Sequence, residues 1–291
     1  MNTIRADHAF LEALHCQRLF PDDAVIPLVC WLTPRVPEAI ESLIRQVGHV
    51  KRLRAGEYVF GPKDRYDAIV LMTAGLGGRA FGSEYTQSNN AIALSVPGRI
   101  IGGNHCFFSG RPGVGRYQFL TEGEAIYAPR MRILEAIRSD AGLFERFAAY
   151  LDELFQADRL GFGAIALLPV KSRLLLWLLA WGMTFGDLQK DDGETRLVFE
   201  PMLSVGLLSR VVSANPSQVK RDLLSLRKTD VLRRDGPRAS VAPEALDAVW
   251  TWLRNSEELA AVYRRPVDWR GFVTRYPRGR VPSLAYAVGA P

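Results

Sequence analysis

The sequence predicts an α+β protein that combines an N-terminal β-roll, a long central helix and a C-terminal winged helix-turn-helix. Three patterns carry this prediction. Short β-rich runs separated by glycine-bearing turns fill residues 51–129, which is typical of a roll of antiparallel strands. A long segment with a helical apolar stripe follows at 141–166. Two short amphipathic segments then flank a tight turn within 203–228.

The composition fits an ordinary globular protein. The 291 residues are 48% apolar and 23% charged, enough for two domains with separate cores. A net charge of +6 permits an anionic partner. Three widely spaced cysteines do not suggest a disulfide framework, which favours a reducing cytoplasm. We expect no signal peptide, because no basic region precedes an apolar core, and no membrane segment, because no uncharged apolar run reaches about 18 residues.

The pattern along the chain predicts five parts. Residues 1–50 read as an N-terminal helical extension broken by prolines, and 51–140 as the β-roll. A dimerisation helix and hinge follow at 141–168, and the winged helix-turn-helix occupies 169–254. The C-terminal extension, 255–291, is rich in Pro and Arg with interleaved aromatic residues. We expect it to pack on the molecule; contact with nucleic acid is the alternative.

The helix-turn-helix is predicted from its caps and apolar spacing. Ser204 suits the N-cap of a first helix, and Asn215 can cap a second helix that has Pro216 at its first position. The first helix should bury Val205, Leu207, Leu208 and Val211, and the second Val219, Leu223, Leu224 and Leu226. The following "VLRRDGPRASVA" has strand–turn–strand spacing around Asp235-Gly236, as a wing requires.

The outward face of this motif predicts binding to double-stranded DNA. Eight Lys or Arg and three Asp lie between Leu203 and Arg238, a local net charge of +5. Arg221 and Gln218 are expected to read base edges in the major groove, with Ser217 and Lys220 assisting. The full candidate set is Ser204, Asn215, Ser217, Gln218, Lys220, Arg221, Lys228, Arg234 and Arg238. The alternatives are a solvated helix pair and a degenerate module that contacts protein.

The long helix predicts a homodimer. Apolar residues three and four apart form a coiled-coil seam, and we expect the dimer interface at Phe144, Phe147, Leu151 and Leu154. The alternative is one amphipathic helix packed against its own domain. Asp158 falls on the projected seam, where two like charges would face each other and act as a switch, unless both carboxylates point to solvent. The glycines at 161 and 163 and the Leu168-Pro169 break suggest a hinge.

The order of these parts carries a family resemblance. A β-roll containing "GEYVFGPKDRYDAIVLMTAG" and "PGRIIGG", then a long helix, "LLPVKSRLLLWLLAW" and a winged helix-turn-helix resembles the catabolite-activator/fumarate-nitrate-reductase regulator (Crp–Fnr) family over about residues 51–250. The resemblance implies a homodimeric bacterial transcription regulator that binds a palindromic operator, with RNA polymerase as a candidate partner. It also implies a roll related to a cyclic-nucleotide pocket.

The pocket residues depart from the family pattern. In "GGNHCFFSGRPGVGRYQ", Gly102 matches, Gly103 stands where the family has its ribose-binding Glu, and Tyr117 replaces a hydroxyl residue. Arg116 matches the phosphate-binding Arg only across extra residues. The resemblance therefore implies that cyclic AMP does not bind in the usual way, since a sugar hydroxyl without its acceptor costs about 1–3 kcal/mol. The candidate effector pocket comprises Gly102, Gly103, Asn104, Arg116, Tyr117, Asp158 and Arg159. A roll without any ligand is the alternative.

No cofactor, metal site or catalytic activity is expected. The adjacent His105 and Cys106 offer imidazole and thiolate, and some family members bind haem near this position, so a haem or small-ligand sensor of the same fold is the alternative. Packing at a turn of the roll is the simpler role for this pair. The chain lacks a P-loop, a serine elbow and a histidine cluster of the kind that holds catalytic metals.

Overall fold

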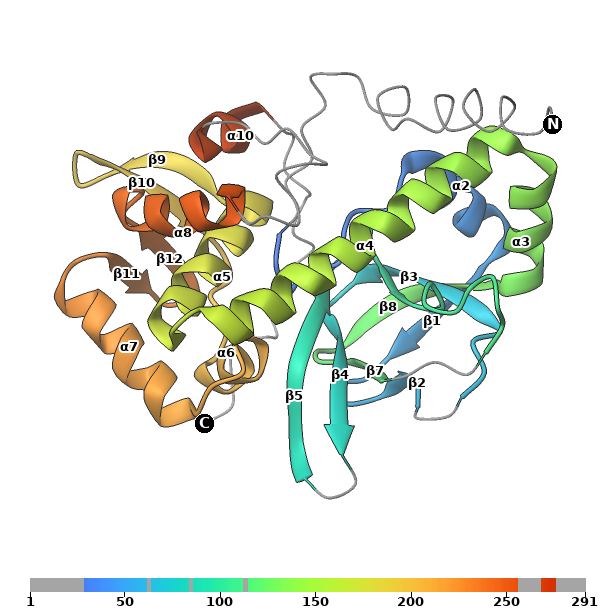
Figure 1. The fold of residues 1–291 in the computed structure, drawn as a ribbon, viewed down its shortest axis with the longest axis horizontal. Helices are drawn as coiled ribbons and strands as arrows, with labels where there is room; N and C mark the ends of the chain where they lie inside the picture. The colour runs from blue at the N-terminus through green and yellow to red at the C-terminus, as the bar shows by residue number, and fades with distance from the viewer. Residues whose placement is uncertain (1–28, 62–63, 84–85, 112–114, 256–267, 276–291) are drawn as a thin grey trace, which may run out of the picture.

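The computed structural model describes residues 29–61, 64–83, 86–111, 115–255 and 268–275. Two compact parts lie at the ends of one long helix, α4 (Ala141–Leu167), which crosses the molecule diagonally in Figure 1. The β-roll and two helices, α2 (Glu38–Val47) and α3 (Arg130–Ser139), lie at one end. A mainly helical part with a small sheet lies at the other. The predicted α+β class and order of parts are confirmed.

The roll consists of two four-stranded antiparallel sheets, with strand orders β1-β8-β3-β6 and β2-β7-β4-β5. The glycine turns join strands at tight reversals. Gly75 has φ +85° between β3 and β4, and a Cβ there would lie 2.6 Å from the carbonyl oxygen of Glu122, so only glycine fits. The strands are β1 (His49–Leu53), β2 (Tyr58–Phe60), β3 (Ala68–Ala74), β4 (Gly77–Ser83), β5 (Thr86–Ser95), β6 (Ile100–Gly102), β7 (Arg116–Phe119) and β8 (Gly123–Pro129).

The C-terminal part surrounds a third antiparallel sheet, of order β11-β12-β10-β9. The buried helix α5 (Val170–Phe185) precedes the hairpin of β9 (Asp187–Asp191) and β10 (Glu194–Phe199). Helices α6 (Val205–Val211) and α7 (Pro216–Lys228) follow, then β11 (Leu232–Asp235) and β12 (Arg238–Val241). Helix α8 (Glu244–Asn255) follows β12. This is the expected helix-turn-helix with its wing.

The long helix is continuous through both of its later glycines. Its N-cap Asp140 accepts a hydrogen bond from the Leu143 N–H at 3.0 Å, and the helix ends only at Leu168, before Pro169. A Cβ at position 161 would come within 3.2 Å of the Trp31 ring, so glycine there allows close packing. Neither Gly161 nor Gly163 interrupts the helix, which ends at the predicted Leu168-Pro169 break. The hinge itself stays a prediction.

One apolar core joins the two parts of the molecule. Trp31 and Leu32, from the segment before α2, pack with Leu94 of the roll and with buried side chains of α4 and α5. The same cluster continues into α6, α7, α8 and the third sheet. Strand β5 also lies against α6 (Figure 1). Two smaller clusters fill the roll and its contact with α4. The roll and the helix-turn-helix are thus held in a fixed relation, and the predicted domain boundaries stay a prediction.

The two extensions are described in part. Within the predicted N-terminal helical extension, α2 forms and buries Ile40 and Ile44, while residues 1–28 of that extension lie outside the described residues. In the C-terminal extension, the described helix α10 (Trp269–Arg275) packs on the C-terminal part, with Trp269 fully buried. The Trp269 indole N–H donates to Asp247 at 3.1 Å. None of the described helices is both long and apolar enough to cross a membrane.

Candidate nucleic-acid interface

Helices α6 and α7 begin at the predicted caps. The Ser204 hydroxyl oxygen accepts from the Leu207 N–H at 3.3 Å, and the Asn215 side chain accepts from the Ser217 N–H at 2.8 Å. The turn between the helices is held from α5, since Arg173 donates to the carbonyl oxygens of Val212 at 2.7 Å and Ser213 at 3.0 Å. The orientation of α7 is thereby fixed by side chains outside the motif.

The buried face of α7 differs from the prediction at one residue. Val219, Leu223 and Leu226 are buried, as expected, but Leu224 is 46% exposed. The reason is helical spacing: position 224 lies three and four residues after Arg221 and Lys220, both exposed, so it shares their outward face. Leu224 was therefore wrongly assigned to the core.

Three side chains on α7 are linked by hydrogen bonds. The Gln218 amide Nε2 donates to Asp222 Oδ2 at 2.9 Å, and Arg221 Nη2 donates to Gln218 Oε1 at 2.7 Å. Each end of the Gln218 carboxamide thus has one partner, which leaves one N–H and one oxygen lone pair for a bidentate contact with adenine. Gln218 is a positioning residue for Arg221 in this arrangement. Its predicted role as a base reader stays a prediction.

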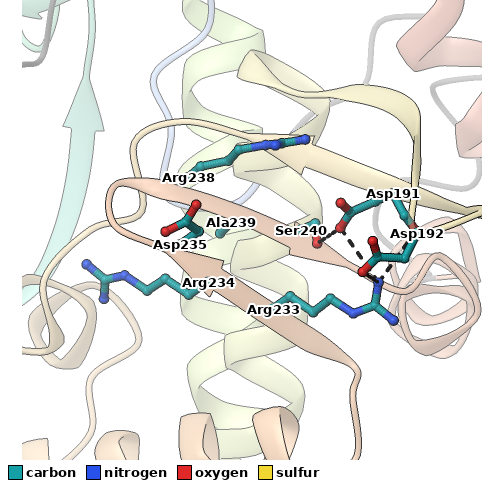
Figure 2. Close-up of a pocket in the computed structure, with 8 residues that line it drawn as sticks. All are labelled: Asp191, Asp192, Arg233, Arg234, Asp235, Arg238, Ala239 and Ser240. Carbon is teal, nitrogen blue, oxygen red and sulfur yellow. Dashed lines mark hydrogen bonds and ion pairs between the residues drawn. The ribbon is translucent and has the colours of Figure 1, made fainter.

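The wing has the predicted strand–turn–strand form. Asp235 pairs with Arg238 across the turn, Gly236 has φ +57°, and Arg234 Nε donates to the Gly236 carbonyl oxygen at 2.9 Å. Figure 2 shows Arg233 and Arg234 directed to opposite sides of β11. The pocket drawn there is lined by Asp191, Asp192, Arg233, Arg234, Asp235, Arg238, Ala239 and Ser240. Three arginines and three aspartates line it, so the pocket itself is not a purely basic surface.

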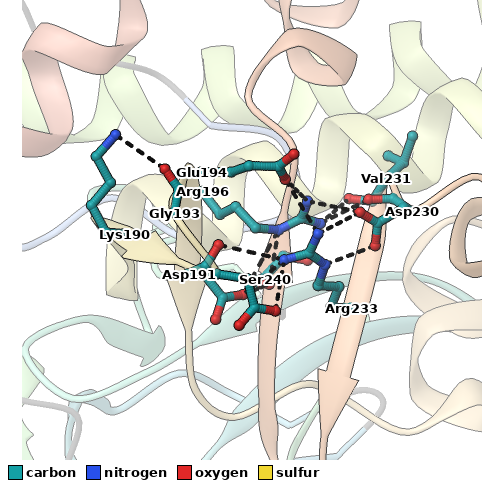
Figure 3. A network of polar contacts seen from close by, with 10 residues as sticks. Lys190, Asp191, Gly193, Glu194, Arg196, Asp230, Val231, Arg233 and Ser240 are labelled. Atoms are coloured by element: carbon teal, nitrogen blue, oxygen red, sulfur yellow. Dashed lines mark hydrogen bonds and ion pairs between the residues drawn. The ribbon is translucent and has the colours of Figure 1, made fainter.

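A network around Arg196 joins the wing to the end of α7 (Figure 3). Arg196 is 1% exposed and donates to the carbonyl oxygens of Asp230 at 2.9 Å and Val231 at 3.1 Å, and to the Ser240 hydroxyl at 3.1 Å. Arg233 donates to both carboxylate oxygens of Asp230, which raises the pKa of the Arg233 guanidinium. The Arg196 side chain therefore fixes the spacing between α7 and the wing. The signal in the sequence was one arginine at the start of the buried half of the strand "ETRLVF".

A second buried polar cluster ties α4 to the interior of the roll. Arg79 of β4 is 6% exposed and forms an ion pair with Asp158 of α4 at 2.5 Å. Arg79 also donates to His105 Nε2 at 2.5 Å. Since an arginine can only donate, Nε2 accepts, and the imidazole proton lies on Nδ1, 3.1 Å from Asn104 Oδ1 and from the Tyr117 hydroxyl.

Charge in this cluster follows from its burial. Burial lowers the pKa of His105, which agrees with a neutral imidazole. Burial acts to raise the pKa of Asp158, but the contacts of its carboxylate with His105 and Arg79, together with the charge of Arg79, outweigh burial and hold that pKa below its usual value. The 3.5 Å contact between His105 and Asp158 is therefore not a full ion pair. Arg79 and Asp158 carry the charges, and each neutralises the other.

The ion pair overturns the expected switch at Asp158. The carboxylate faces Arg79 of its own protomer and not a second Asp158, so like charges do not meet there. Arg159, the next residue of the predicted pocket, is exposed. The arginine that reaches the roll interior is Arg79, which we did not predict. Its signal was a charge in the strand "GGRAFG", among small and apolar residues.

The remaining predicted pocket residues are placed around this cluster. Gly103 has φ +89°, and a Cβ there would collide with the carbonyl oxygen of Ala68, so position 103 cannot carry a ribose-binding carboxylate. A Cβ at Gly102 would come within 2.9 Å of the Phe60 ring. Arg116 is half-buried at the start of β7, opposite Ala80. Among the described residues, no group of three His, Cys, Asp or Glu is placed to hold a metal ion.

The apolar face that α4 leaves open shares only Phe144 with the predicted seam. Phe147, Leu151 and Leu154 lie in the core between α4 and the roll, where Phe147 is 0% exposed and packs 4.7 Å from the Phe107 ring. These three residues cannot meet a partner, because their own roll covers them. Exposed aromatic rings lie instead at Phe144, Phe155 and Phe162. With 3.6 residues a turn, these three share one face of the helix.

Comparison with known proteins gives similarity in structure but not in sequence. No family model matches the chain, and no curated relative matches it. FixK2 from Bradyrhizobium japonicum superposes with a TM-score of 0.57 at 14% identity, covering 76% of this chain and 100% of that one. The global regulator CLP of Xanthomonas campestris gives 0.56 at 15% identity, covering 70% and 99%. TTHB099 from Thermus thermophilus, a transcriptional regulator of the CRP family, gives 0.51 at 15% identity, covering 71% and 97%. The roll, the long helix and the winged helix-turn-helix together give this chain the fold of the Crp–Fnr transcription regulators.

Proposed function

We propose that the protein is a sequence-specific DNA-binding transcription regulator. The observation that carries the proposal is the outward face of α7, where Lys220, Arg221 and Lys228 are exposed on a helix held by the Arg173 and Arg196 contacts. A recognition helix in the major groove presents such side chains to guanine acceptors and phosphates. Arg234 and Arg238 of the wing extend the basic surface, on which Ser204, Asn215 and Ser217 are candidate phosphate contacts at the helix starts.

The regulator acts as a homodimer that pairs through α4. Phe155 and Phe162 are 48% and 50% exposed, and they stand one heptad apart on the open face of the helix. Several large aromatic rings exposed on one helix face are costly to leave in water. A two-fold dimer places two α7 helices about 34 Å apart, so the operator is a palindrome with half-sites one DNA turn apart.

The roll does not take cyclic AMP in the usual way. Its interior arginine already has a counter-ion in Asp158, and the backbone at Gly103 leaves no room for a carboxylate side chain. The Tyr66 and Tyr117 rings, with centroids 5.6 Å apart, occupy the space beside this ion pair. The roll therefore serves to position α4 in this proposal.

Selection from a pool of random DNA duplexes tests the function directly. The wild type should enrich a palindrome and bind it with an affinity that falls steeply with salt, through counterion release. Arg221→Ala should weaken binding by about 1–3 kcal/mol and relax specificity at one position, whereas Lys228→Ala should reduce the salt slope by about 1. Arg132→Ala, on α3 far from α7, is the matched control and should bind as wild type. Absence of any enriched sequence refutes the proposal.

A further inference from the structure

Leu224 is the one large apolar side chain left exposed among residues 169–255 of the described chain. All other large apolar residues of α7 are buried, and the helix gains nothing from an apolar group in water at this position. The outward face of the predicted recognition helix therefore contains one apolar point.

Four cations surround this leucine. Lys220 and Arg221 precede it by four and three residues, and Arg227 and Lys228 follow it by three and four, so all are its neighbours on the helix surface. All four are exposed. Covering the leucine with an apolar protein surface would bury several of these charges, which is costly without partners. A polyanion with an apolar point of its own fits this surface better.

The major groove of DNA offers that combination. Phosphates line both edges of the groove, and the C5-methyl group of thymine is the apolar feature that a base pair presents there. On the same face, Arg221 is held by Gln218, which Asp222 holds in turn. Arg221 thus has a fixed direction, one helical turn before Leu224.

We propose that Leu224 reads a thymine methyl group, in a base pair next to the one that Arg221 contacts. The inference rests on the proposed DNA-binding function and names one element of its operator. The leucine packs on the methyl group and excludes water from it, and a cytosine or purine at that position has no such group to cover. Leu224 is in this way a specificity-determining residue.

Uracil substitution in the selected operator tests the inference. Uracil lacks only the C5-methyl group, so replacing the thymine in one half-site should weaken wild-type binding about fourfold, the value of one buried methyl group. Leu224→Ala should bind the thymine operator about as weakly as wild type binds the uracil operator, and should not distinguish the two. Lys220→Ala is the control: it should weaken binding to both operators and keep the fourfold ratio.

Two results overturn the inference alone: equal wild-type affinity for thymine and uracil at every operator position, or a Leu224→Ala variant that keeps the full uracil effect. Since Leu224 is exposed, its replacement should leave the circular dichroism spectrum and melting temperature unchanged, so a loss of binding is not a loss of fold. Failure to select any operator would instead overturn the proposed function and this inference together.

Discussion

At the residue scale, the ion pair between Arg79 and Asp158 is the interaction whose loss should cost most. Both side chains are largely buried, so removing one leaves a charge without a counter-ion in an apolar interior. Asp158→Asn should lower the free energy of unfolding by about 3–5 kcal/mol, measured by urea denaturation. This is the opposite of the stabilisation that a like-charge switch would give.

The matched controls separate charge burial from helix propensity. Asp152→Asn makes the same change on an exposed residue of α4 and should cost under about 0.5 kcal/mol. The double variant Arg79→Met/Asp158→Leu should recover most of the lost stability, because neither charge is then left alone. If Asp158→Asn is as mild as Asp152→Asn, the ion pair is not a stabilising contact between α4 and the roll.

Glu153 predicts a pH dependence of stability. Burial, reinforced by the neighbouring Asp152, raises the pKa of this carboxyl group to about 7 in the folded protein, above the value of about 4.5 for an exposed glutamate. The folded state therefore holds its proton more tightly than the unfolded state between these two values. The free energy of unfolding should fall by up to about 3 kcal/mol as pH rises from about 4.5 to about 7. Glu153→Gln should flatten this part of the curve, measured by urea denaturation at a series of pH values.

At the scale of elements, α4 uses one face to pack against its own roll and, in the proposed dimer, another face to pair with a second protomer. Phe155→Glu combined with Phe162→Glu places charges on the open face, so light scattering should find folded monomers that no longer bind the operator. Phe147→Glu places a charge in the core against Phe107 and should unfold the protein. A folded, monomeric Phe147→Glu variant would restore the seam first expected from the sequence.

Short-range sequence patterns predicted where helices and turns form, but long-range packing determines which face of a helix is buried. The caps at Ser204 and Asn215 and the wing turn at Gly236 depend on residues within a few positions of one another, so the sequence is sufficient to find them. The choice between two apolar faces of α4 depends on where the roll lies. No local pattern contains that information, and Phe147 and Phe155 look alike in the sequence.

The buried polar contacts could not be paired from the sequence for the same reason. Arg79 and Asp158 are far apart along the chain, and only the closing of the roll against α4 brings them together. Each inward arginine is a charged residue inside a strand, Arg79 between Gly78 and Ala80 and Arg196 just before an apolar run, but neither pattern identifies the partner. The Gln218 contacts are closer in sequence, and their i,i+3 and i,i+4 spacing was a signal that could have been used.

At the scale of the whole molecule, the shared core predicts a single unfolding transition. Trp31 packs between the roll, α4 and α5, so separating the two parts exposes apolar surface on both. Wild-type calorimetric and van't Hoff enthalpies should agree. Trp31→Ala should remove the apolar contact that joins the roll to α4 and α5, which we call the joint, and so split the transition in two. Trp252→Ala, on α8, should leave one transition at a lower temperature. Two transitions already present in the wild type would contradict the joint.

The same joint has a consequence for the nucleic acid. In the proposed dimer, each recognition helix is held rigidly to its own roll and α4, so the two helices have a set separation and any mismatch with the helical repeat must be absorbed by curvature of the duplex. Smooth bending of a 20–30 base-pair site by 40–90° costs on the order of 1–6 kcal/mol, less where pyrimidine–purine steps kink easily. Selected operators should therefore favour such steps between the half-sites, at base pairs that no side chain touches, and circularisation assays should show these duplexes bent in the complex.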